Sequence, residues 1–134
     1  MTDARGLPLG VVVTGGQAHE SKHFEAVMNT VQVRQRRRPD AVAGDKGYSY
    51  PRIRSWLRRR GIEAVIPSRS DQPAVRINKR KYRGRNVIER CIGWLKCCRR
   101  ITTRYEKLAT HFLAMVKLAM IQRCLRILDP SDRT

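Results

Sequence analysis

The stretch DAVAGDKGYSYPRIRSWLRRRGIEAVIP, residues 40–67, decides the fold that this sequence predicts. It opens with a short apolar run over residues 40–45 and closes with a second one over residues 62–67. Between them, Pro51 stands in the first turn of a segment with helical spacing, and Gly61 ends that segment. Strand, helix and strand in this order predict a right-handed βαβ unit with parallel strands. The helix residues expected to face the sheet are Ile53, Trp56 and Leu57.

The rest of the chain continues the alternation of strands and helices. LGVVVT, residues 9–14, is a β-branched run that predicts a buried strand. HESKHFEAVMNTVQVRQ, residues 19–35, carries apolar residues three and four apart, which predicts a helix. Residues 68–81 have the composition of a basic loop, and two long helices are predicted over about 85–104 and 107–128. The order predicts an α/β layered domain with parallel strand pairing.

The two C-terminal helices each carry an apolar stripe. In the first helix the stripe consists of Ile88, Cys91, Ile92, Leu95 and Cys98. In the second helix it consists of Leu108, Phe112, Met115, Leu118, Ala119, Ile121 and Leu125. The second stripe is broad, so we expect that helix to pack against other elements instead of facing water.

Charge is the strongest compositional signal. The chain has 134 residues, which is the length of about one domain, and 41% of them are hydrophobic. Its 29 Lys and Arg residues against 11 Asp and Glu residues give a net charge of +18. Such an excess repels itself in a compact state unless a polyanion neutralises it, which favours nucleic acid as the partner. The apolar runs are too short to span a membrane, and MTDARG lacks the apolar core of a signal peptide.

Cysteine and histidine give weak signals. The four cysteines, at positions 91, 97, 98 and 124, form no C-x-x-C pair, which favours reduced and partly buried thiols over a zinc site or a disulfide. His19 and His23 have the i, i+4 spacing of a metal pair. Without a third ligand, a surface helix face is the simpler interpretation.

YRGRNVIERCIGWLK, residues 82–96, keeps one acid, Glu89, within the most basic part of the chain. Wound as a helix at about 100° per residue, the stretch places Tyr82, Arg85, Glu89 and Lys96 on one face. The simplest interpretation is an Arg–Glu pair on a solvated helix, which contributes about 0.2–0.5 kcal/mol. The functional interpretation is that Glu89 binds a divalent cation while its basic neighbours hold phosphates.

A metal site would need a second carboxylate. Mg²⁺ or Mn²⁺ takes oxygen ligands, usually one or two carboxylates with water and substrate phosphate. Asp45 ends the strand AVAGD, and the carboxyl ends of parallel strands are where functional groups gather. We therefore expect Asp45 and Glu89 to share a metal ion.

These residues resemble a known family. The pattern Tyr82-x2-Arg85-x3-Glu89-x6-Lys96 resembles the signature of the DDE transposases of bacterial insertion sequences. The block from Asp45 to Tyr48, DKGY, resembles the one that carries the second catalytic Asp of that family. The resemblance covers roughly residues 3–125, with further similar segments in TGGQAHES (14–21), GIEAVIPSR (61–69) and RRITTRYEKLATHFLAMVKLA (99–119).

The resemblance implies a ribonuclease-H-like fold, dependence on Mg²⁺ or Mn²⁺, and DNA strand cleavage and transfer at transposon ends. It implies that Asp45 and Glu89 are the second and third metal-binding catalytic carboxylates. Arg85 and Lys96 would contact DNA phosphate, and Tyr82 would support that contact. The partners implied are transposon-end and target DNA, in an active dimer in the bacterial cytoplasm at the nucleoid.

A basic surface extends on both sides of the signature. Ten Lys and Arg residues lie between Asn78 and Arg104, against Glu89 alone. They add Lys79, Lys81, Arg99 and Arg100 to the expected DNA contacts. If about six to eight of these residues meet phosphates, the logarithm of the binding constant falls with that of salt at a slope of roughly −5 to −7.

The opening of the chain departs from the family pattern. MTDARGLPL resembles the turn into the third strand of the family's sheet, so we expect a partial ribonuclease-H-like fold that lacks the first two strands. The expected organisation is a catalytic domain over residues 1–128, truncated at its N-terminus, and a tail over 129–134. Asp3 is a candidate for the missing first Asp, but a turn-forming role suits it better. A polypeptide from an upstream reading frame would then supply that Asp, and the chain alone would be inactive.

Two alternatives compete with a working transposase. One is a non-catalytic basic protein that binds nucleic acid through charge alone, in which case Glu89 would be dispensable. The other is the remnant of a decayed transposase.

Overall fold

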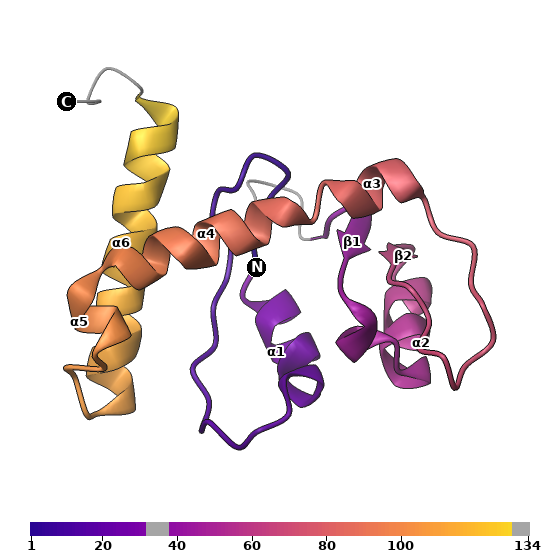
Figure 1. Ribbon diagram of the computed structural model, residues 1–134, viewed down its shortest axis with the longest axis horizontal. Coiled ribbons are helices and arrows are strands. Elements are labelled where there is room, and N and C mark those ends of the chain that lie inside the picture. The colour runs from indigo at the N-terminus through magenta and orange to yellow at the C-terminus, as the bar shows by residue number, and fades with distance from the viewer. Residues whose placement is uncertain (32–37, 130–134) are drawn as a thin grey trace. The chain divides into compact units, whose positions relative to one another are not determined.

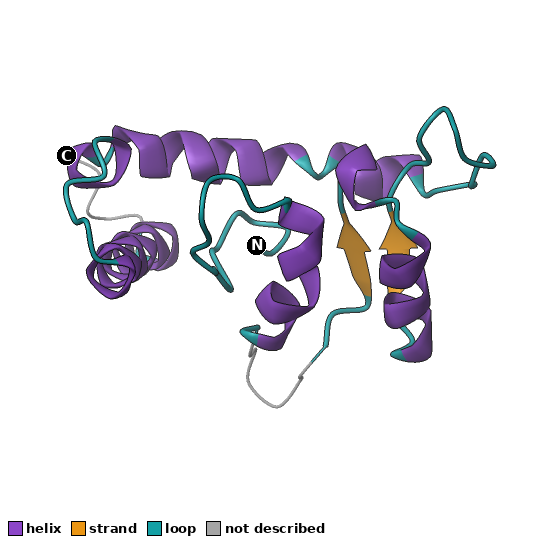
Figure 2. Cartoon of the chain, turned by 90° about the horizontal axis from the view of Figure 1, so that it is seen from below, coloured by secondary structure: helices purple, strands orange, loops and turns teal. Residues whose placement is uncertain are grey.

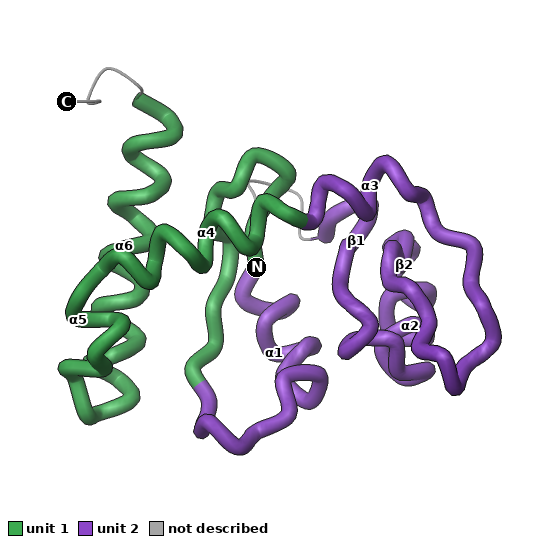
Figure 3. Tube along the Cα trace, in the orientation of Figure 1, with its two compact units in different colours: residues 1–13, 86–134 green, residues 14–85 purple. Residues whose placement is uncertain are grey.

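The computed structural model describes residues 1–31 and 38–129. The chain forms two compact units: one holds residues 14–85, and the other holds residues 1–13 and 86–134 (Figure 3). Figure 1 labels the elements of each unit.

The unit of residues 14–85 is built on the predicted βαβ arrangement. Strand β1 (Ala41–Ala43) pairs in parallel with β2 (Glu63–Val65), and Val42 faces Ala64 in the register. The two arrows point the same way in Figure 2, and helix α2 (Pro51–Arg59) connects them. Both predicted strands, the helix between them and the parallel pairing are confirmed.

Residues with local backbone preferences mark both ends of helix α2. Pro51 occupies the start of the helix, where no intrahelical partner is needed for its missing N–H, and Gly61 adopts a φ of +66° just beyond the end. The predicted core residues Ile53, Trp56 and Leu57 are all buried, and α2 packs against β2. Burial of each such side chain contributes about 1.5–3 kcal/mol.

The segment before β1 packs on the same core. A short 3-10 helix, η1 (Glu20–His23), leads into α1 (Phe24–Asn29). The buried ring of Phe24 lies edge-on to that of Trp56 at 5.8 Å between centroids, and 5.9 Å from that of Tyr48. The predicted helix is thus confirmed over residues 20–29 and ends there, with Thr30 as its C-cap, earlier than predicted. Its predicted extension over residues 32–35 falls outside the described residues.

The predicted basic loop of residues 68–81 is partly wrong. Helix α3 (Lys79–Arg83) begins two residues before the expected end of the loop. Asn78 is its N-cap: the Asn78 side-chain oxygen accepts from the backbone N–H of Lys81 at 3.1 Å. An Asn directly before a run of good helix formers is a helix start signal that outweighs the charge of the run.

The other unit is mainly helical. Helix α4 (Asn86–Cys97), α5 (Arg99–Thr102) and α6 (Ala109–Leu128) contact one another. The N-terminal residues add a turn closed by an antiparallel bridge between Thr2 and Pro8. Oδ1 of Asp3 accepts from the backbone N–H of Arg5 and of Leu7 in this turn, so the turn-forming interpretation of Asp3 is confirmed.

The predicted strand over residues 9–14 is wrong. These residues have no regular structure, and β1 and β2 form the one sheet found in the described residues. A β-branched run favours an extended backbone, but a strand also needs a neighbour that satisfies its N–H and C=O groups. Composition alone cannot supply that neighbour.

The single helix predicted over 85–104 is also wrong. The chain breaks at Cys98, which has an extended backbone between α4 and α5. The hydroxyl of Thr102 donates to the carbonyl of Lys96 across this break, and the hydroxyl of Thr103 donates to the carbonyl of Arg99 at 2.9 Å. The Thr102 hydroxyl thus bonds a carbonyl in the last turn of α4, where helical partners run out.

The two predicted apolar stripes are only partly buried. In α4, Cys91 is buried but Ile92 is 45% exposed. In α6, Ala119 is buried and Phe112 and Met115 are half-buried, so the expectation that this face packs is confirmed in part. The N-cap residue Leu108 and the helix residues Leu118, Ile121 and Leu125 are exposed. Inside its unit, α6 is about 30 Å long and its neighbour α4 only about 18 Å, too short to cover it. No helix within the described residues is long and apolar enough to cross a membrane.

Candidate active site

Asp45 directly follows the β1 ladder. The N–H of Gly44 donates to the carbonyl of Val65 at 3.3 Å, so strand pairing continues to the residue before Asp45. Asp45 is the N-cap of a second 3-10 turn, η2 (Lys46–Tyr48), and its Oδ1 accepts from the N–H of Gly47 at 2.8 Å. The carboxylate is exposed. The residue therefore lies at the carboxyl end of a parallel strand, where an α/β sheet places functional groups.

Gly47 lets the capping carboxylate approach this turn, and Gly44 is closely packed beside it. A Cβ at Gly47 would lie 2.9 Å from Oδ1 of Asp45, which is too close for the capping carboxylate to stay in place. A Cβ at Gly44 would lie 3.4 Å from Ile66 and 3.5 Å from the ring of Tyr48. The block AGDKGY therefore combines a strand end, a capping acid and small residues that let neighbouring groups approach it.

Asp45 lines an open cavity of about 300 Å³. The lining residues come from two segments, the one around η1 and the one around η2: Ala18, His19, Glu20, Ser21, Asp45, Gly47 and Tyr48. Polar side chains from both segments therefore face the same solvent-filled space as the Asp45 carboxylate.

Tyr48 connects the two sides of this cavity. Its hydroxyl donates to Oε2 of Glu20 at 3.4 Å. Burial, followed by the negative charges of Glu20 and Asp45, raises the pKa of Tyr48 to about 12. The hydroxyl therefore keeps its proton at neutral pH and remains a hydrogen-bond donor.

His19 and Ser21 organise the η1 side. Nδ1 of His19 accepts from the N–H of Ser21 at 3.3 Å and lies 2.8 Å from the Ser21 hydroxyl. The buried Ser21 in turn accepts, through its carbonyl, a hydrogen bond from Arg52 of α2. His19 thus caps a surface turn.

The sequence did not point to Glu20 or Tyr48 as site residues. Tyr48 belongs to the DKGY block and Glu20 to TGGQAHES, so both lie in segments that the resemblance already singled out. The sequence does not show that Glu20 and Tyr48 lie close together, because 28 residues separate them along the chain.

The signature residues do not form one continuous helix. Tyr82 lies in α3, Gly84 is the C-cap of α3, and α4 begins at Asn86, after Arg85. The expected single helix, on which all four residues would share one face, is therefore wrong. Tyr82 and Arg85 still lie close: the Arg85 guanidinium is 5.8 Å from the centre of the Tyr82 ring.

Glu89 and Lys96 share α4. Their separation of seven residues leaves them only about 20° apart around the helix. Both side chains are exposed. Glu89 stands in the first turn, where a negative charge stabilises the helix by about 0.3–1 kcal/mol. Glu89 thus stabilises the start of α4 in addition to any role in metal binding.

The predicted DNA contacts differ in their surroundings. Lys79 is exposed in α3, and Arg99 is exposed in α5. Lys81 pairs with Glu63 at 2.5 Å, and Arg100 pairs with Glu106 at 2.5 Å. These four paired side chains are all partly exposed, so the pairs are weak in solution and their cations are available for exchange with phosphate.

The two candidate metal ligands belong to different units: Asp45 to the unit of residues 14–85, and Glu89 to the other. Over residues 1–31 and 38–129, no group of three His, Cys, Asp or Glu side chains is arranged to hold a metal ion. Their convergence on one ion stays a prediction.

All four cysteines are free thiols.

Comparison with known proteins relates the chain to transposases. The sequence profile described as transposase DDE domain matches residues 1–122. A protein of Burkholderia cepacia, assigned as the transposase of insertion sequence element IS402, is 31% identical over 140 aligned positions, which cover 100% of this chain and 64% of that relative. A protein of Brucella ovis, assigned as the transposase of element IS6501, is 32% identical over 130 positions, which cover 94% of this chain and 95% of that relative. No solved structure matches the chain.

The profile match includes both the Asp45 turn and the complete signature from Tyr82 to Lys96. The chain spans less than two thirds of the IS402 relative and nearly all of the IS6501 relative. By its profile match and these relatives, the chain belongs to the DDE transposases of bacterial insertion sequences.

Proposed function

We propose that this protein cuts and joins DNA strands at the ends of an insertion sequence, with a divalent cation held by Asp45 and Glu89. The observation that carries the proposal is the Asp45 carboxylate, which closes a parallel strand, is exposed, and lines an open cavity. Family membership supports phosphoryl transfer on DNA as the reaction.

The chemistry of the two acids suits Mg²⁺ or Mn²⁺. Both ions take carboxylate oxygens together with water and substrate phosphate. Among the described residues, Asp45 accepts one hydrogen bond, from Gly47, which leaves carboxylate lone pairs for a cation. When bound, such an ion would polarise the scissile phosphodiester and make a bound water more acidic.

The basic residues of the signature would hold the DNA. Lys96 lies on the same side of α4 as Glu89, two turns and about 10 Å along the helix, so both would face one stretch of DNA backbone. Arg85 and the adjacent Tyr82 ring would also contact the DNA backbone, with the guanidinium on phosphate and the ring supporting it. Cations fixed beside the reacting phosphate stabilise the charge that develops in the transition state.

A wider surface would supply most of the affinity. Lys79 and Lys81 flank the signature on one side, and Arg99 and Arg100 on the other. Contacts of this kind are made to phosphates and carry no sequence information. The residues proposed here therefore account for holding and cutting DNA, and leave recognition of the element's end sequences to other groups.

The remaining features follow from the same assignment. We propose that the βαβ unit is part of a ribonuclease-H-like fold and that residues 1–128 belong to the catalytic domain, with residues 129–134 as a tail. A transposase that joins two element ends is expected to act as a dimer, and its substrate places it at the bacterial nucleoid.

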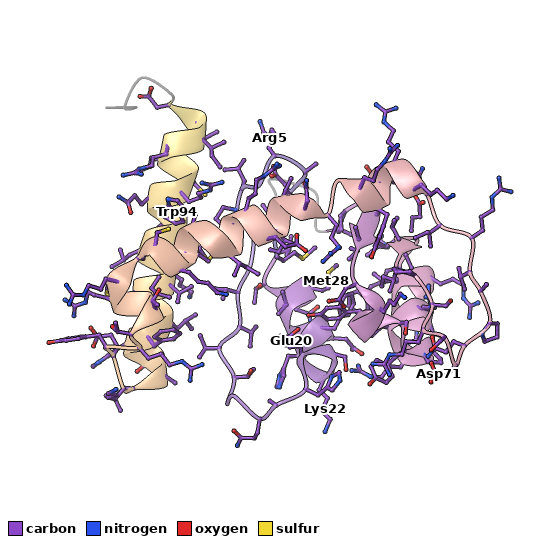
Figure 4. The ribbon with its side chains drawn as sticks, viewed as in Figure 1. Arg5, Glu20, Lys22, Met28, Asp71 and Trp94 are labelled. Atoms are coloured by element: carbon purple, nitrogen blue, oxygen red, sulfur yellow. The ribbon has the colours of Figure 1, made fainter. Side chains whose placement is uncertain are left out.

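The test uses substitutions that keep shape and remove charge. In the intact transposase, Asp45→Asn and Glu89→Gln should each abolish Mg²⁺-dependent nicking of DNA that carries the element's ends, because each loses a metal ligand. Binding of the same DNA in a gel-shift assay should persist. Asp71→Asn is the matched control, because Asp71 is an exposed acid of the loop that follows β2 (Figure 4).

Retained nicking in either variant would refute the assigned site. The net charge of +18 supports one alternative, a basic protein that binds nucleic acid without cutting it. In that case, the parent protein would bind DNA with no Mg²⁺-dependent nicking, and Glu89→Gln would change nothing.

A further inference from the structure

The segment that precedes α1, which includes η1, contacts the η2 turn that follows Asp45. Residues of η1 contact residues of η2, and Glu20 is labelled in Figure 4 at this end of α1. The ring of His19 meets that of Tyr50 edge-on, with 5.8 Å between centroids. Several separate contacts thus join two segments that are distant in the sequence.

Tyr48 is the central residue of this junction. Its ring fills the space above Gly44, and its hydroxyl reaches Oε2 of Glu20. Its backbone N–H donates to the carbonyl of Asp45 at 3.1 Å. Tyr48 therefore connects the two segments, through its hydroxyl to Glu20 and through its backbone N–H to Asp45.

Asp45 itself is held weakly. Its side chain is exposed, and its cap on Gly47 is one hydrogen bond. An exposed carboxylate on a three-residue turn has several rotamers within reach unless the turn is fixed from outside. The contact from Tyr48 to Glu20 supplies such a fixed point on the cavity side.

We propose that Glu20 and Tyr48 are positioning residues, which hold the η2 turn so that the Asp45 carboxylate points into the cavity in one orientation. The role rests on the proposed function, because it concerns the same metal-binding carboxylate. Residues that orient a metal ligand affect the affinity for the metal without contacting it. Their loss typically weakens metal binding by about 10–100-fold.

The experiment measures Mn²⁺ binding to the purified chain by the electron paramagnetic resonance signal of the free ion. Tyr48→Phe removes the hydroxyl and keeps the ring that packs on Phe24. Glu20→Ala removes the acceptor, whereas Glu20→Gln keeps a side-chain oxygen in its place. We expect Tyr48→Phe and Glu20→Ala to weaken Mn²⁺ binding by roughly tenfold or more, and Glu20→Gln to restore most of it.

A second readout is independent of metal. The backbone N–H of Gly47 donates to Oδ1 of Asp45, so its nuclear magnetic resonance shift and hydrogen exchange report the orientation of the carboxylate. Tyr48→Phe and Glu20→Ala should shift this resonance and speed its exchange in metal-free protein. The matched controls are two. Tyr50→Phe removes the hydroxyl of the α2 N-cap, which accepts from Arg69, and Glu25→Gln removes the charge that pairs with Arg52.

The outcomes separate the two proposals. Unchanged Gly47 exchange and Mn²⁺ affinity in Tyr48→Phe and Glu20→Ala would overturn the positioning role, even if Asp45→Asn abolished binding. A Glu20→Gln variant as impaired as Glu20→Ala would overturn it too, because Glu20 would then act through its charge as a direct ligand. Mn²⁺ binding that survives Asp45→Asn would refute the metal site of the proposed function, and Gly47 exchange would still decide the positioning role.

Discussion

Oη of Tyr48 lies 3.4 Å from Oε2 of Glu20, across 28 residues of sequence. The contact joins the segment before α1 to the turn after β1, and both segments line the cavity that contains Asp45. The strand-end carboxylate thus shares its cavity with a residue from outside the βαβ arrangement that carries it.

Gly47→Ala tests the turn directly. The new Cβ would lie 2.9 Å from Oδ1 of Asp45, so the carboxylate must leave its capping position. We expect nicking to be lost and the free energy of unfolding to fall by about 0.5–2 kcal/mol, the usual cost of a lost cap. Urea unfolding and a nicking assay measure the two effects. Gly16→Ala is the control, because its Cβ meets nothing within 4 Å.

Tyr48 predicts a specific dependence of stability on pH. Its pKa of about 12 lies above the ordinary value of 10, chiefly because the ring is partly buried. Between these values the folded state keeps a proton that the unfolded state has released, so the free energy of unfolding falls as pH rises. Tyr48→Phe should remove this part of the fall. Urea unfolding of the parent protein and of Tyr48→Phe between pH 10 and about 12 measures this difference. Identical dependence of the unfolding free energy on pH in the two proteins would contradict the raised pKa of Tyr48.

Salt dependence tests the proposed DNA surface. With about six to eight phosphate contacts, the slope of log K against log salt should be roughly −5 to −7. Lys79→Ala and Lys96→Ala should each make the slope shallower by about 0.9, the value for one contact. Fluorescence anisotropy with a DNA duplex at several salt concentrations measures it. Arg60→Ala should leave the slope unchanged, because the Arg60 guanidinium stacks on Trp56 at 3.7 Å, outside this surface.

The core of the βαβ unit should respond strongly to truncation. Ile53 is fully buried in α2, so Ile53→Ala should lower the free energy of unfolding by about 2–5 kcal/mol. Val75 lies outside the βαβ arrangement in the same compact unit and is 45% exposed, so Val75→Ala should change the free energy of unfolding by no more than about 0.5 kcal/mol. Urea unfolding followed by circular dichroism compares the two. Similar losses in both variants would show that α2 does not anchor the unit.

The sequence alone determined the features that depend on neighbours along the chain. Pro51 and Gly61 mark the ends of α2 because their backbone preferences are local, and the spacing of Ile53 and Trp56 defines one helical face. The family signature is likewise a set of residue types at fixed intervals. Asp45 could be placed at a strand end for the same reason.

Only the tertiary structure decided which faces and segments find partners. In the run over residues 9–14, Leu9 and Gly10 bond only to the chain end at Met1 among the described residues, so no strand forms. Leu118 and Leu125 stay exposed because no described neighbour in their unit covers them. The contact between Glu20 and Tyr48 belongs to the same class. A pattern shows which side chains are apolar or polar, whereas burial and strand pairing depend on a second surface that the local sequence does not encode.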